Sequence, residues 1–599
     1  MARRKRRKAD SRAASDAPAA AAADARAAAR RGTPRWSLAL VTVLLPLAML
    51  ALVEGGLRVA GYGHDLEPLF IDAPGMPGYR QANPRAVLRL VPDPMQAPSV
   101  SIETAYFRAS RAPGSFRVVV QGASSAAGFP YGLGASLAGE LEQRLRLVWP
   151  EREIEVIQTA MAAVNSYALV DFAPEILAQQ PDAVVVYIGH NEYLGILGVG
   201  STMRLASSPW VTRAYLAVRE LRLFQLMQSF LPRVAAPPAP PTAGDETLMA
   251  RVAGERSIPL DSTLYRRGLD QYEHNLGELL ATYRRAGVPV FIGTVASNER
   301  DQPPFAGARA REAFERGRQL EAAGDSGGAR EAYRSARDLD ELRFRAPGAF
   351  NDIVRRVAAR ERATVVDSQQ RLADASPGGI VGASLMLEHV HPNLDGYFLL
   401  ADAFFDALLE SDLLGEPEVS VRGEVARTEM PVTEIDRWLG EYKVGRLKSG
   451  WPFRDRQEDY RLPPATSEGE RLAQALFREQ TDWPRAQDAL RRHYRETGDV
   501  AGYAHVTTVL ADAFPTAHAL QFEAAAALIE RQRPQDALRY ARRAAGLGPQ
   551  AVNSWLVLGH ALALLGRRAE AIAALERALE LEPGNATARA ALERLRPDS

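Results

Sequence analysis

The chain has 599 residues, of which 46% are hydrophobic and 24% charged, so most of its length is expected to be globular. Its 73 basic and 73 acidic residues cancel, and net charge therefore gives no support for nucleic acid as a partner. Cysteine is absent, which excludes disulfides, thiolate metal sites and cysteine nucleophiles. A chain of this length exceeds one hydrophobic core, and we expect two or three domains.

The N-terminus combines a basic segment with an apolar one. Residues 1–35 are rich in arginine and alanine and are expected to be a disordered cytoplasmic tail, with a nucleic-acid-binding arm as the alternative. An uncharged run at 36–53 is near the lower length limit for crossing a bilayer. Basic residues before such a run keep the N-terminus in the cytoplasm. We expect a single-pass, uncleaved signal anchor at 36–55 in the cytoplasmic (inner) membrane, with the bulk of the chain periplasmic; a cleaved signal peptide is the alternative.

Predicted strands and helices alternate from 112 to 415, which indicates a parallel sheet covered by helices on both faces. Residues 56–111, rich in proline, glycine and aromatic residues, are expected to be a connector that packs on this domain. The predicted strands are 117–120, 154–157, 183–188, 288–292 and 363–366. The predicted helices include 137–147, 166–178, 213–231 and 265–286, followed by a helical hairpin insert at about 309–340 that resembles a tetratricopeptide (TPR) unit.

The C-terminal region carries a repeat. Small and large apolar residues recur there with the 34-residue spacing of the TPR pattern, namely Trp555, Leu558, Gly559, Leu562, Ala571, Leu575, Ala578 and Pro583. A looser copy lies 34 residues earlier, and a third, degenerate unit is expected before it. We predict an all-α TPR domain at 467–599 that binds a protein partner, joined by a linker with some local structure at 416–466. A generic alanine-rich helical bundle is the alternative.

The strand predicted at 117–120 breaks into a turn of small residues that carries Ser124. A strand that stops at Gly122 and delivers a hydroxyl to a turn is how an α/β sheet exposes a nucleophile at its carboxyl edge. Alone, this pattern is also typical of an ordinary turn between a strand and a helix. Two later stretches favour the nucleophile.

The strand predicted at 183–188 also ends at a glycine, and Asn191 follows it. Parallel strands present their carboxyl ends at one edge of a sheet, so Asn191 is expected at the same edge as Ser124, where its amide can donate a hydrogen bond to a developing oxyanion. Glu388 and His391 form the third stretch. Their spacing lets one loop hold a base and the carboxylate that orients it.

With these residues in place, the sequence resembles the SGNH (GDSL-like) hydrolase family over roughly residues 112–412. Ser124 stands at the family's nucleophile block, Asn191 at its Gly-x-Asn block, and Glu388 and His391 at its closing Asp-x-x-His-Pro block. The resemblance implies a flavodoxin-like, three-layer α/β/α fold with a parallel sheet and no metal or organic cofactor. It also implies that Ser124 is the nucleophile, His391 the base, Glu388 the partner of the base and Asn191 an oxyanion donor.

The sequence departs from the family pattern at three positions. The glycine whose N–H completes the oxyanion hole beside that of Ser124 falls on Ala163, so the loop needs a backbone conformation that alanine tolerates. Ala123 replaces the usual acidic residue, and Glu388 replaces aspartate. The last two changes remove no catalytic group.

Two further histidines are candidate pocket residues. His190, beside Asn191, is expected either to line the pocket or to be a hydrogen-bonded loop residue. His389 is expected to be a packed or surface residue. The alternative is a metal shared by His389, His391 and Glu388, but no further cluster of ligand residues accompanies them, and we expect no metal site.

Together these features predict a membrane-anchored serine esterase that hydrolyses acyl esters, with a cell-envelope glycan or a lipid as candidate carrier of the ester. One alternative uses the same residues to transfer the acyl group to a sugar hydroxyl of a cell-envelope glycan. The other is a membrane-tethered TPR scaffold with a degenerate hydrolase fold. Ala163 and Ala123 favour the scaffold, whereas the retained Ser124, Asn191 and His391 oppose it.

Overall fold

The computed structural model describes residues 35–92, 94–204, 209–230 and 247–596. The chain divides into two compact units, one of residues 1–65 with 215–236 and one of residues 66–214 with 237–599. Of the tail expected at 1–35, residues 1–34 lie outside the described residues.

The first unit contains the apolar helix α2 (Arg35–Val59), which includes Pro46. Among the described residues it is the one helix long and apolar enough to cross a membrane, over Thr42–Val59. It packs with α6 (Arg222–Phe230). A single helix was predicted at 213–231, and this prediction is wrong, because α5 (Pro209–Val218) and α6 are separate. In an unbroken helix the Leu223 N–H would bond to a carbonyl of the preceding turn. Here it donates to Glu54 of α2 at 2.8 Å, and this bond caps the N-terminus of α6.

The connector forms a small antiparallel sheet in the order β1-β2-β3. Its strands are β1 (Phe70–Asp72), β2 (Tyr79–Ala82) and β3 (Tyr106–Arg108), with the 3₁₀ turn η1 (Ala86–Arg89) after β2. The buried Arg89 pairs with Asp171 at 2.8 Å, and Arg108 pairs with Glu153 at 2.7 Å. Residues 66–111 therefore pack on the α/β domain.

The core of the α/β domain is a five-stranded parallel sheet. Its strands are β4 (Phe116–Gly122), β5 (Ile154–Gln158), β6 (Ala183–Tyr187), β7 (Val290–Gly293) and β8 (Thr364–Val366), in the order β5-β4-β6-β7-β8. Every residue of β4, β5, β6 and β7 is buried, as expected for strands covered on both faces. When the five strands are numbered from β4 along the chain, their order in the sheet is 2-1-3-4-5, which is the flavodoxin-like order.

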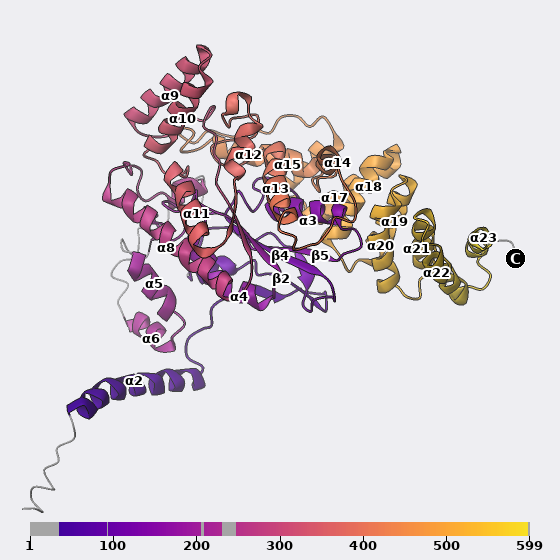
Figure 1. The fold of residues 1–599 in the computed structure, drawn as a ribbon, viewed down its shortest axis with the longest axis horizontal. Helices are drawn as coiled ribbons and strands as arrows, with labels where there is room; N and C mark the ends of the chain where they lie inside the picture. The colour runs from indigo at the N-terminus through magenta and orange to yellow at the C-terminus, as the bar shows by residue number, and fades with distance from the viewer. Residues whose placement is uncertain (1–34, 93, 205–208, 231–246, 597–599) are drawn as a thin grey trace, which may run out of the picture. The chain divides into compact units, whose positions relative to one another are not determined.

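Helices cover both faces of the sheet. On one face α3 (Leu137–Val148) packs on α13 (Leu394–Leu409), and α12 (Ser368–Asp374) packs beside α13. On the other, α8 (Thr263–Arg285) packs between α4 (Ser166–Ala178) and α11 (Gly348–Glu361) (Figure 1). Ser136, Asn165, Ser262 and Asn393 cap the N-termini of α3, α4, α8 and α13, which explains where these helices begin.

The expected hairpin is α9 (Ala308–Ala322) with α10 (Ser326–Leu339), and a short helix, α7 (Leu248–Val252), precedes α8. The predicted fold class is confirmed.

The C-terminal region is a helical TPR array. Its helices are α16 (Glu468–Phe477), α17 (Trp483–Thr497), α18 (Val500–Ala513), α19 (His518–Glu530), α20 (Pro534–Leu547), α21 (Val552–Leu564), α22 (Arg568–Leu581) and α23 (Ala586–Leu595) (Figure 1). Neighbouring helices are packed through alanines, including the fully buried Ala524, Ala525 and Ala537, which lets them approach closely. The segment expected as a linker contains α14 (Gly423–Thr428) and α15 (Glu434–Lys448), and Ile435 and Tyr442 of α15 share a hydrophobic core with α16–α18.

Helix α15 also contacts the loops that hold the candidate catalytic residues. A Cβ on Gly440 would lie 2.4 Å from the Tyr131 ring, so only glycine permits this approach to the loop after β4. The Lys443 Nζ donates to the Pro130 carbonyl at 3.3 Å, and the Lys448 Nζ donates to the Leu387 carbonyl at 2.9 Å. The helical array is therefore joined to the α/β domain directly beside the candidate site.

Candidate active site

Ser124 lies in the turn that follows β4, at the carboxyl edge of the sheet. Its side chain is half-buried, and its carbonyl accepts a hydrogen bond from the Phe129 N–H at 3.1 Å. The neighbouring Ser125 is buried and donates from its hydroxyl to the Val390 carbonyl at 3.1 Å. This bond ties the serine turn to the loop that carries His391.

The loop at 387–391 brings a base and a carboxylate to Ser124. The Nε2 atom of His391 lies 2.8 Å from the Ser124 Oγ, and its Nδ1 atom contacts Oε1 of Glu388. The Glu388 side chain is buried, and Oε1 also accepts the His391 backbone N–H at 3.0 Å. The structure thus places a hydroxyl, an imidazole and a carboxylate in one hydrogen-bonded chain.

The surroundings of His391 keep its ring neutral. Burial lowers the pKa of His391 from its ordinary value, because the imidazolium loses hydration there. The carboxylate of Glu388 at Nδ1 opposes this shift, since a negative charge favours the imidazolium. A ring that is neutral at rest and supported once protonated has the properties of a general base. The Phe129 ring packs on the imidazole with centroids 4.6 Å apart.

Two backbone donors lie at the same edge of the sheet. Among the described residues, the N–H groups of Ser124 and Ala163 donate no hydrogen bond to another protein atom. The Met161 N–H donates to the Gly122 carbonyl at 3.2 Å, which attaches the loop of Ala163 to the end of β4. Asn191 donates through Nδ2 to the Val164 carbonyl at 3.1 Å. An amide nitrogen has two N–H groups, so one remains for a ligand.

Ala163 adopts a left-handed conformation, with φ of 64°. Non-glycine residues rarely do so, because their Cβ atom crowds the carbonyl that follows. The conformation persists because the Ile196 N–H donates to the Ala163 carbonyl at 2.8 Å. A Cβ on Gly195 would lie 2.6 Å from that carbonyl, so glycine is needed for this close approach of the two loops.

The two further histidines differ in their environments. His190 is a hydrogen-bonded loop residue: its Nδ1 accepts the Ala346 N–H at 3.2 Å, and its Nε2 donates to the Ala296 carbonyl at 3.1 Å. Burial lowers the pKa of His190 to about 3, and the nearby His391 adds to this shift. His389 is not at the surface. It is buried, and its Nδ1 contacts Oε2 of Glu388.

Three residues at the site carried no clear signal in the sequence. Phe129, beside His391, and Ser125, bonded to Val390, resemble ordinary loop residues. Glu192 is fully buried and accepts hydrogen bonds from the N–H and hydroxyl of Ser166 at 2.7 and 2.8 Å. Burial raises the pKa of Glu192 to about 7. The sequence signal for Glu192 was its position next to Asn191, just after a predicted buried strand.

Known proteins are similar to separate parts of the chain. Residues 552–585 match the family model described as tetratricopeptide repeat. No curated protein matches the sequence. The chain is similar in structure to the acetyl xylan esterase AlAXEase, with 13% identity over 49% of this chain and 100% of that one and a TM-score of 0.28. It is likewise similar to a lipase/acylhydrolase from Enterococcus faecalis, with 14% identity over 51% of this chain and 100% of that one and a TM-score of 0.26.

Two further similarities concern the helical array. The TPR domain of Arabidopsis OM64 is 25% identical over 19% of this chain and 96% of that one, with a TM-score of 0.18. The first TPR of Spaghetti (RPAP3), a structure bound to an HSP90 peptide, is 24% identical over 19% of this chain and 89% of that one, with a TM-score of 0.18.

Proposed function

We propose that this chain is an SGNH-type serine esterase that hydrolyses acyl esters. The observation that carries the proposal is the distance of 2.8 Å between the Ser124 Oγ and the His391 Nε2, with Glu388 on the far side of the imidazole. A hydroxyl becomes a useful nucleophile when a neutral base can remove its proton as it attacks. The lowered pKa of His391 supports this role.

In the first half-reaction the Ser124 Oγ attacks the ester carbonyl and its proton passes to the His391 Nε2. Glu388 stabilises the imidazolium that results. The N–H groups of Ser124 and Ala163 and the free N–H of Asn191 bind the oxyanion. The tetrahedral intermediate then collapses, the alcohol leaves with the proton held by His391, and an acyl-Ser124 ester remains.

In the second half-reaction His391 removes a proton from water, which attacks the acyl-enzyme. The acid is released, and Ser124 regains its proton from His391. Each half-reaction returns His391 to the neutral state. If a sugar hydroxyl replaces water in this step, the same residues perform O-acyl transfer.

We further propose that α2 anchors the chain in the cytoplasmic membrane with the N-terminus inside, because a basic segment precedes an apolar helix. The rest of the chain then lies outside the cytoplasm. The TPR array is proposed to bind a protein partner, since TPR domains of similar structure have been solved with a bound peptide.

The test is a screen of short- and long-chain acyl esters with the full chain and its Ser124→Ala variant. We expect hydrolysis by the wild-type chain and none above background by the variant. Adding sugar acceptors to the same reaction separates free acid from acylated sugar and so distinguishes hydrolase from transferase. Equal hydrolysis by Ser124→Ala would reject the serine mechanism. Absence of turnover with every ester, together with retained binding of a partner by the repeats, would support the scaffold.

A further inference from the structure

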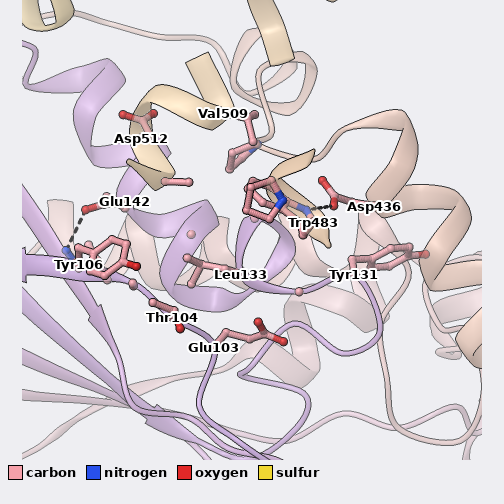
Figure 2. A pocket seen from close by; sticks show the side chains of 18 of the residues that line it. Glu103, Thr104, Tyr106, Tyr131, Leu133, Glu142, Asp436, Trp483, Val509 and Asp512 are labelled. Atoms are coloured by element: carbon pink, nitrogen blue, oxygen red, sulfur yellow. Dashed lines mark hydrogen bonds between the residues drawn. The ribbon is translucent and has the colours of Figure 1, made fainter. Parts of the chain in front are cut away.

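A cavity of about 980 Å³ lies between the α/β domain and the helical array. Its walls come from the connector at 103–108, the loop at 129–134, α3, β5, and helices α15, α16, α17, α18 and α20. Figure 2 shows Leu133, Trp483 and Val509 around it. A volume of this size is at the upper end of the range of about 300–1,000 Å³ that small-molecule sites occupy.

Much of the wall is apolar or aromatic. Leu133, Leu439, Phe477 and Val509 contribute, together with the indole of Trp483. The indole N–H is already bonded to Oδ1 of Asp436 at 2.7 Å, so the ring offers only its apolar faces (Figure 2). These surfaces suit an alkyl or acyl chain.

The buried acidic residues of the wall are occupied by other protein groups. Asp436 also accepts from the Thr433 hydroxyl at 2.8 Å, and Glu155 pairs with Arg117 at 2.7 Å. Glu142 accepts from Arg146 at 2.8 Å and from the Val156 N–H at 3.1 Å. These carboxylates therefore bring little unsatisfied negative charge to the cavity.

Two arginines of the cavity wall, Arg146 and Arg543, lie near Asp512. Asp512 is shared by three guanidinium groups: Arg539 at 2.8 Å, Arg146 at 3.6 Å and Arg543 at 3.8 Å. Its Oδ2 also accepts the Tyr540 hydroxyl at 2.9 Å. Its Oδ1 accepts no hydrogen bond, so Arg146 and Arg543 meet this oxygen only beyond hydrogen-bond distance.

Arg543 faces Asp512 at 3.8 Å, which is beyond hydrogen-bond distance. Among the described residues its side chain makes no hydrogen bond, although it lines the cavity and is 23% exposed. Burial lowers the pKa of Arg543, and the charges of Arg146 and Arg539 add to the shift. A largely buried guanidinium beside two like charges is costly unless an anion joins it.

We propose that this cavity binds an amphipathic anion, with its carboxylate or phosphate group on Arg543 and Arg146 and its alkyl or acyl chain along the apolar wall. Guanidinium groups bind both anions through paired N–H donors. A fatty acid and an anionic lipid share this chemistry. The proposal concerns a site separate from Ser124 and does not require that the chain be an esterase.

Binding is measured by calorimetry with the full chain in phosphatidylcholine nanodiscs, with empty nanodiscs as the blank. All proteins carry Ser124→Ala, so that no ligand is consumed and the outcome is independent of hydrolysis. Octyl phosphate and octanoate are compared with octanol and with inorganic phosphate. We expect at least one octyl anion to bind ten-fold or more tightly than octanol and than phosphate alone. The tighter of the two anions identifies the headgroup.

Arg543→Met is expected to weaken binding of that anion by at least about ten-fold, because a charge-assisted contact is lost. The matched control, Arg568→Met, removes an exposed arginine of α22 and should bind as the parent protein does. Arg543→Met also removes a positive charge that lies beside Arg146 and Arg539. The melting temperature of this variant should therefore equal or exceed that of the parent protein.

A second pair of variants tests the apolar wall. Val509→Trp fills the cavity and should abolish binding, whereas Val500→Trp, at an exposed position on the same helix, should not. Octanol binding equal to that of the anions would overturn the proposal. So would unchanged affinity in Arg543→Met or in a folded Val509→Trp variant.

Discussion

His389 contacts Oε2 of Glu388 through its Nδ1 atom, so the carboxylate that holds His391 on one oxygen holds a second imidazole on the other. The His389 N–H also donates to Oε2 at 2.6 Å. Aromatic rings enclose His389, with Phe305 and Phe453 at 5.5 Å and Phe344 at 5.9 Å between centroids. A buried carboxylate fixed on both oxygens cannot rotate away from His391.

We therefore expect His389 to be a positioning residue. His389→Phe keeps the packing but removes a hydrogen bond to a buried charge, and kcat should fall by about 10- to 100-fold with little change in KM. His389→Gln, which retains a donor, should restore part of the rate. The control is His560→Phe at an exposed position. Wild-type kcat in a folded His389→Phe variant would contradict this role.

The proposed nucleophile and base should behave as one unit. Ser124→Ala and His391→Ala each interrupt the same proton transfer, so the double variant should be little slower than either single one. Asn191→Ala removes an oxyanion donor alone and should lose roughly 10²–10³ in kcat. Single-turnover rates with a chromogenic ester measure both effects. Multiplicative losses in the double variant would show that the two side chains act separately.

Ala163→Gly should stabilise the protein without loss of activity. The left-handed conformation costs alanine roughly 1–2 kcal/mol, and the greater freedom of glycine in the unfolded chain offsets about 0.5–1 kcal/mol of this. We expect a gain of up to about 1.5 kcal/mol in the free energy of unfolding, measured by thermal or denaturant unfolding. Arg362→Gly, which relieves a φ of 60° at the end of α11, is the control away from the site. A fall in stability for Ala163→Gly would show that the alanine methyl group contributes packing that outweighs the strain.

The pH dependence of kcat/KM should report His391. The base must be neutral to accept a proton, so activity is present above its pKa and is lost as pH falls through it. Because burial lowers that pKa, the acid limb should lie below the ordinary histidine value of about 6.5. Glu388→Gln removes the charge that favours the imidazolium and should move the limb to still lower pH while reducing kcat. A shift of the limb to higher pH in Glu388→Gln would be incompatible with this assignment.

Local patterns in the sequence were sufficient to predict the parallel sheet, since a buried strand such as β6 is read from a continuous apolar run that ends at a glycine. They were also sufficient to predict that Ser124 and His391 lie close together, because both positions follow from the motifs and their order in the chain. The positions of His389 and Phe129 depend on which side chains surround them in the folded protein, and no spacing encodes that. The break between α5 and α6 depends on Glu54, which is remote in sequence.

The contacts of α15 with the two loops that hold the candidate catalytic residues have a consequence for chemical labelling. The sequence contains four lysines, Lys5, Lys8, Lys443 and Lys448, so residues 9–599 carry only the two that contact these loops. Burial lowers the pKa of Lys443, which increases the share of reactive free amine, whereas Lys448 is exposed. An amine-reactive dye would therefore attach to the folded part of this chain at the edge of the candidate active site, with no engineered residue.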